Sequence, residues 1–132
     1  MIRHLTATGL DTSTTTFLQP NVGYRWRILS ILLWLTTGTA TGNRAVNIGI
    51  APYQSSGGLA LIIANTQVQS GVSSTYYSQL IGASNAPGNG GGNYTMYSDI
   101  YSDASAHIAI DAGIQTGDTY GYDIQVIEEP DI

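Results

Sequence analysis

Runs of β-branched, aliphatic and aromatic residues recur along this chain, and clusters of Gly, Asn, Pro and Ser separate them. The alternation is cleanest in residues 44–51, where Val46, Ile48 and Ile50 are interleaved with small residues and Pro52 follows. Alternation with period two is typical of strands, and no long window has the 3.6-residue period of a helix. The pattern therefore predicts an all-β protein.

The predicted strands are bounded by turn residues. They cover residues 3–8, 13–19, 24–37, 44–51, 59–64, 72–81, 93–101, 106–111 and 119–128. In the last two, Ile108 and Ile110 are expected to face inward with His107 and Asp111 outward, and the stripe from Tyr120 to Val126 is expected to share one face. Eight or nine strands in one domain, residues 1–132, predict a two-sheet antiparallel β-sandwich of jelly-roll type. An immunoglobulin-like sandwich is the alternative.

Residues 24–37 form the longest predicted strand. Strict alternation places one set on a common face: Trp26, Ile28, Ser30, Leu32 and Trp34. It places the other set opposite: Arg25, Arg27, Leu29, Ile31, Leu33 and Leu35. We expect at least one of the two Trp side chains to be buried. The apolar run 28–35 is too short to cross a bilayer, so no membrane partner is predicted.

Charge is scarce and unevenly placed. The chain has no Lys and no Cys; its four Arg all lie in residues 1–44, and eight of its nine acids lie at or beyond Asp99. The first segment carries a net +3 and the last a net −8. Two interpretations stay open: the two ends pair within one fold, or they attract each other between identical subunits. The overall charge of −5 argues against nucleic-acid binding.

Few residues carry catalytic chemistry. The late acids, among them Asp99 and Asp103, lack the spacing of a calcium loop, so no metal or other cofactor is predicted. A Ser-His-Asp triad could be drawn from His107 and Asp111, but no Gly-x-Ser-x-Gly elbow accompanies them. We therefore predict a protein that is not an enzyme.

Tyr is abundant, with nine residues against one Phe. Tyr combines apolar area with a hydroxyl group, so a Tyr-rich face suits subunit contacts or sugar stacking. The segment Pro87–Asn93 is almost entirely Gly and Asn, which indicates a hairpin tip or a loop that orders against a partner. The predicted partner-binding residues are Arg25, Arg27, Arg44, Tyr94, Tyr97, Tyr101, Gly90, Gly91 and Gly92.

Two segments together resemble a known class of proteins. One runs from Tyr24-Arg25-Trp26-Arg27 through Thr41-Gly42-Asn43-Arg44, and the other is Ile114-Gln115-Thr116-Gly117-Asp118-Thr119-Tyr120 with the strand that follows. They resemble small virion structural proteins of tailed bacteriophages, of the capsid decoration or cement type. The resemblance covers about a third of the chain and none of residues 52–110.

The resemblance implies a β-sandwich homo-oligomer, expected to be a trimer, that binds the phage major capsid protein and stabilises the capsid surface of the virion. The alternative is a carbohydrate-binding or host-recognition module of a phage tail. A small hydrolase is a third, weaker hypothesis.

Overall fold

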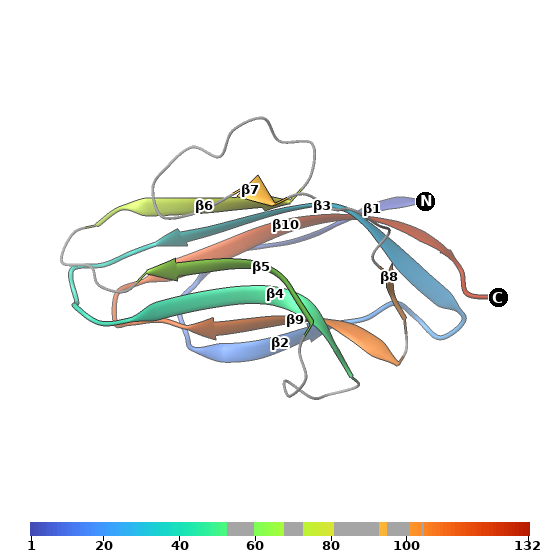
Figure 1. Ribbon diagram of the computed structural model, residues 1–132, viewed down its shortest axis with the longest axis horizontal. Helices are drawn as coiled ribbons and strands as arrows, with labels where there is room; N and C mark the ends of the chain where they lie inside the picture. Colours follow the sequence, from blue (N-terminus) through green and yellow to red (C-terminus); the bar gives the residue numbers. More distant parts are fainter. Residues whose placement is uncertain (53–59, 68–72, 81–92, 95–100, 104) are drawn as a thin grey trace.

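The computed structural model describes residues 1–52, 60–67, 73–80, 93–94, 101–103 and 105–132. Ten strands are defined in these residues, and two sheets stack as the layers of a sandwich (Figure 1). The strands are β1 (Ile2–Leu10), β2 (Thr14–Leu18), β3 (Tyr24–Thr36), β4 (Arg44–Pro52), β5 (Ala60–Gln67), β6 (Thr75–Leu80), β7 (Asn93–Tyr94), β8 (Tyr101–Ser102), β9 (Ala106–Gly113) and β10 (Thr119–Pro130).

The strand order is that of a jelly roll. The first sheet, which we call sheet A, runs β1-β10-β3-β6-β7, with β8 also beside β3; sheet B runs β2-β9-β4-β5. Apart from the two short strands β7 and β8, the pairs β1·β10, β2·β9, β3·β6 and β4·β5 describe one long antiparallel hairpin. The pairs β10·β3 and β9·β4 show that this hairpin is wound around itself. The predicted jelly-roll sandwich is confirmed, and the immunoglobulin-like alternative is not the topology found.

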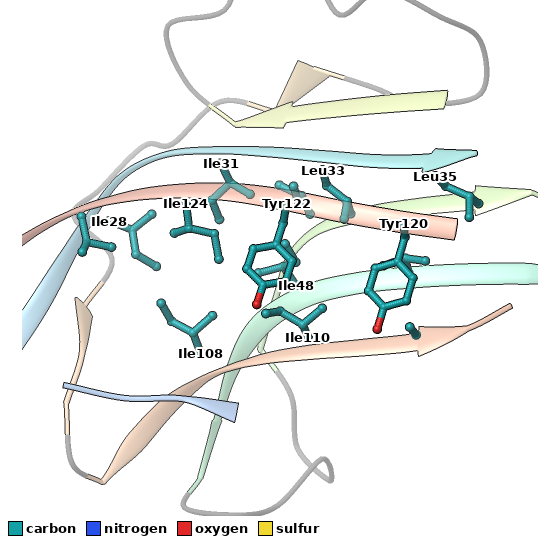
Figure 2. Close-up of a cluster of buried hydrophobic side chains, with 14 of the residues drawn as sticks. Ile28, Ile31, Leu33, Leu35, Ile48, Ile108, Ile110, Tyr120, Tyr122 and Ile124 are labelled. Carbon is teal, nitrogen blue, oxygen red and sulfur yellow. The ribbon is translucent and has the colours of Figure 1, made fainter. Parts of the chain in front are cut away.

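The core lies between the sheets. Tyr120, Tyr122 and Ile124 of β10 point from sheet A toward Ile108 and Ile110 of sheet B (Figure 2). The inward stripes of β9 and β10 agree with the alternation of the sequence. Burial raises the pKa of both Tyr hydroxyls. These two Tyr residues therefore fill the core rather than a surface for partners.

A β-bulge in β3 overturns the predicted faces of that strand. Gln125 pairs with Ser30 but Val126 pairs with Ile28, so Leu29 is the extra residue of β3. An extra residue shifts the side-chain alternation by one position. Trp26 and Ile28 therefore point inward together with Ile31, Leu33 and Leu35, while Leu32 and Trp34 lie on the outer face of sheet A. The prediction that one Trp is buried is confirmed for Trp26; the prediction that both share a face is wrong.

The remaining differences are smaller. The strand predicted over 93–101 is described only at its two ends, as β7 and β8, and residues 95–100 lie outside the described residues. β7 runs parallel to β6, whereas the other strand pairs are antiparallel. His107 faces outward as predicted, yet it is buried and lies edge-on to Phe17 of the neighbouring strand, with ring centroids 6.2 Å apart.

Candidate functional site

The charge polarity of the sequence is largely resolved within the subunit. Three basic side chains of the first segment form ion pairs with acids of β10 or the turn before it: Arg3–Glu128 at 2.6 Å, Arg25–Glu129 at 3.1 Å and Arg44–Asp118 at 2.7 Å. His4 also lies 3.2 Å from Asp123. Antiparallel pairing of β1 and β3 with β10 brings these residues together. Of the two interpretations, pairing within one fold is the one observed, and the charge argument for a head-to-tail contact loses its basis.

Arg44 is buried rather than presented to a partner, with only 1% of its surface exposed. Its guanidinium donates to both carboxylate oxygens of Asp118, at 2.7 and 3.0 Å, and to the carbonyl oxygens of Ala40 and Gly42. Asp118 also accepts hydrogen bonds from the backbone N–H groups of Gly38 and Gln115. This pair joins the β3–β4 loop to the β9–β10 turn, and we call this region the stitched end of the sandwich. Arg44 is therefore removed from the candidate partner-binding residues.

The stitched end also sets the electrostatics of Asp118. Burial alone would raise the pKa of this carboxyl, but the hydrogen bonds from Arg44, Gly38 and Gln115 and the charge of Arg44 outweigh it, so the pKa is lowered. The two loops approach closely here, because a Cβ on Gly38 would lie 3.0 Å from the backbone of Gly117. The geometry indicates a structural rather than a catalytic role for this carboxylate.

Three predicted partner-binding residues meet on the outer face of sheet A. β8 pairs with β3 so that Tyr101 lies opposite Arg27. The guanidinium of Arg25 sits 4.5 Å from the centroid of the Tyr101 ring, a cation–π contact, and pairs with Glu129 on its other side. Among the described residues Arg27 forms no ion pair. We call Arg25, Arg27, Tyr101 and Glu129 the arginine–tyrosine cluster.

The cluster belongs to the end of the sandwich where both chain termini lie (Figure 1), which we call the open end. The exposed large hydrophobic side chains among the described residues all gather there: Met1, Ile2, Val22, Tyr24, Tyr101 and Ile132. Strand pairing of Tyr24 with Pro130 and of Ile2 with Ile127 brings these segments side by side. Exposed apolar side chains concentrated on one part of a protein are typical of an interaction surface.

The other residues that could carry catalytic or metal chemistry do not lie together in the structure. His107 and Asp111 are four residues apart on the extended strand β9, about 13 Å at 3.3 Å per residue, so they cannot form the central pair of a triad. Asp111 instead accepts a hydrogen bond from Thr15, and Asp103 accepts three from Ser105 and Ala106 within its own turn. Among the described residues no group of three or more His or acidic side chains is arranged to hold a metal ion.

For several predicted partner-binding residues, the structure gives no side-chain position that could test the prediction. The backbone of Tyr94, in β7, pairs with that of Leu80, in β6. Tyr97 and the glycines Gly90, Gly91 and Gly92 lie outside the described residues. Sequence reasoning missed Tyr24 and Trp34 as surface aromatic residues. The position of Tyr24 directly after Gly23 at a strand start was a usable signal; the exposure of Trp34 depends on the bulge.

Comparison with known proteins adds no family. No protein-family model matches the chain, and no curated protein is significantly similar to it. The resemblance to virion proteins therefore rests on the two segments quoted above. Within the described part of the chain, no helix suited to crossing a membrane is present.

Proposed function

We propose that this protein is a non-enzymatic virion structural subunit, a phage capsid decoration protein that binds the assembled shell through its open end. The observation that supports this most is the asymmetry between the two ends. The stitched end encloses its charged groups, whereas the open end gathers exposed apolar side chains around the arginine–tyrosine cluster. A subunit that adds contacts to a preformed shell needs such a surface and no catalytic step.

The mechanism would be mass action. A subunit that binds the intact shell more tightly than the disassembled protein stabilises the shell, in proportion to the logarithm of its concentration over the dissociation constant. At the open end, Tyr24 and Tyr101 would supply apolar area, and Arg25 and Arg27 would supply directional hydrogen bonds to carboxylates or carbonyl groups of the major capsid protein. The expected trimer stays a prediction.

The test is quantitative mass spectrometry of purified virions of the phage whose genome encodes this chain. A decoration protein should be present in proportion to the capsid subunits, and its removal should lower the temperature at which the shell disassembles. A copy number close to that of tail proteins would instead favour the host-recognition alternative. Absence from the particle would refute both virion roles.

A double variant tests whether the open end is the surface that binds the shell. The double change Arg27→Ser with Tyr101→Ala should lower shell binding, because it removes a cation and an aromatic ring from the open end. The matched control is Asp123→Asn on the same sheet, away from the open end, which should leave shell binding unchanged. Equal binding by both variants would show that the shell contacts another surface.

A further inference from the structure

The bulge of β3 places a second aromatic site on sheet A, far from the open end. Trp34 lies between Gly121 of β10 and Tyr77 of β6 in the sheet register. Its six-membered ring lies across Gly121, since a Cβ at that glycine would come within 2.5 Å of Trp34 Cζ2. The Cε2–Cζ2 side of the indole is therefore packed close to the backbone of β10. The side chain is partly exposed on the outer face of the sheet.

Among the described residues, the neighbours of this ring on the outer face are Leu32, uncharged polar side chains and one carboxylate. The next outward positions toward the strand ends carry Thr36 and Thr75, whose hydroxyl groups are 2.9 Å apart. On the other side, Leu32 is flanked by Gln79 and Asp123, and the Asp123 side chain is 43% exposed. No Arg lies in this half of the sheet. The nearest Arg along β3 is Arg27, which is seven residues from Trp34, about 23 Å.

We propose that Trp34, with Tyr77 and Asp123, forms a binding site for an uncharged saccharide. The C–H face of a pyranose ring is apolar and packs on an indole face, while the ring's hydroxyl groups need acceptors and donors at its rim. The partly exposed indole, held close to Gly121, supplies the apolar surface, and the Asp123 carboxylate accepts hydrogen bonds from sugar hydroxyls. The hydroxyl groups of Thr36 and Thr75 supply neutral partners. This site is separate from the open end and does not depend on the shell-binding proposal.

The same features disfavour other ligands. A nucleic acid or a sulfated glycan requires cationic side chains, and the described residues of this half carry no Arg or Lys; His4 lies 3.2 Å from Asp123. The bulge strengthens the assignment, since bulges re-aim side chains and without this one Trp34 would point into the core.

The experiment uses Trp34 as its own reporter. In a Trp26→Phe background, Trp34 is the single Trp, and its emission is followed while maltohexaose, cellohexaose and chitohexaose are added up to millimolar concentration. We expect a saturable change with at least one of the three, and calorimetry on the unaltered chain should give the same dissociation constant. If none of the three binds, the proposal is overturned.

Two variants separate a binding role from a packing role. Trp34→Ala should weaken saccharide binding at least about tenfold by calorimetry, which corresponds to about 1.4 kcal/mol. Asp123→Asn, which leaves the Trp34 ring on Gly121, should weaken it by a smaller factor with no change in unfolding temperature. Tyr101→Ala at the open end is the control and should bind as before. Saccharide binding that survives Trp34→Ala, or a Trp34→Ala effect on oligomeric state alone, would refute the assignment.

Discussion

Replacing Asp118 by Asn tests the stitched end most sharply. The Asp118 carboxylate is fully enclosed and accepts four hydrogen bonds, two of them from the guanidinium of Arg44. The asparagine amide keeps the shape but has one acceptor oxygen, and it turns an NH2 group toward donors. It also leaves the buried charge of Arg44 without a counter-charge. Removing one partner of a buried ion pair costs about 3–5 kcal/mol.

Urea unfolding followed by circular dichroism measures this loss. With a urea dependence of about 2 kcal/mol per molar, typical of a small domain, the midpoint should fall by roughly 1.5–2.5 M. The matched control is Asp123→Asn, because that carboxylate pairs with His4 at the surface, where an ion pair contributes less than about 1 kcal/mol. If Asp118→Asn lowers the midpoint no more than Asp123→Asn does, Asp118 and Arg44 are not buried together in solution and the stitched end is wrong.

Apolar replacement of both partners extends the test. In some proteins a buried ion pair is replaced by apolar residues at no cost. Here Arg44→Met with Asp118→Leu would also strip partners from two carbonyl groups, those of Ala40 and Gly42, and from two backbone N–H groups of the facing loops. A fully buried group left without a partner costs about 1–3 kcal/mol, and each of these half-buried groups is expected to cost about the lower of these values. The double variant should therefore stay at least about 3 kcal/mol less stable than the unaltered chain.

Three further outcomes are expected. Gly121→Ala should destabilise the fold by about 1–3 kcal/mol in urea unfolding, because its Cβ would meet the Trp34 ring at 2.5 Å and a backbone oxygen of β1 at 2.7 Å; an unchanged midpoint would contradict the ring's position. Acid should destabilise the protein below about pH 4. Hydrogen bonds lower the pKa of Asp118 in the folded state, so the Asp118 carboxylate is protonated in the unfolded chain at a higher pH than in the folded protein. The stabilisation that is present above about pH 4 is therefore lost as the pH falls. In Asp118→Asn this part of the pH dependence should disappear. Light scattering should detect an oligomer whose mass changes little with salt, since the Arg–acid pairs are within the subunit; a monomer at every concentration would refute the expected trimer.

The sequence predicted the architecture because alternation decides both strand position and face. Where a strand runs without interruption, as in β9 and β10, the stripe of residues from Tyr120 to Val126 reaches the core as expected. The bulge in β3 could not be predicted from the sequence, because a bulge is defined by how two strands pair and not by the residues of one strand alone. Both Leu29 and its neighbours suit a strand, and only the opposing Gln125 and Val126 define the extra residue. One unseen residue was enough to move Trp34 from the predicted face to the other.

The sequence predicted individual residues of the candidate site, but it did not predict which of them contact one another. Arg25 and Tyr101 are far apart in the sequence, and their contact depends on β8 pairing with the start of β3. Arg44 was misjudged because Arg is rarely fully buried unless paired. Its partner Asp118 lies on a turn in the other half of the chain, and no local pattern links the two.

The contrast between the two ends limits where a partner can bind without disturbing the fold. At the stitched end, Arg44, Asp118 and four loop backbone groups already satisfy one another, so a ligand for Arg44 or Asp118 would have to break the buried hydrogen bonds between them. At the open end, the pairs of Arg3 and Arg25 are solvent-accessible, and the apolar side chains around them gain burial only when something covers them. A partner at the open end would therefore add contacts without breaking a buried ion pair, as the proposed shell-binding subunit requires.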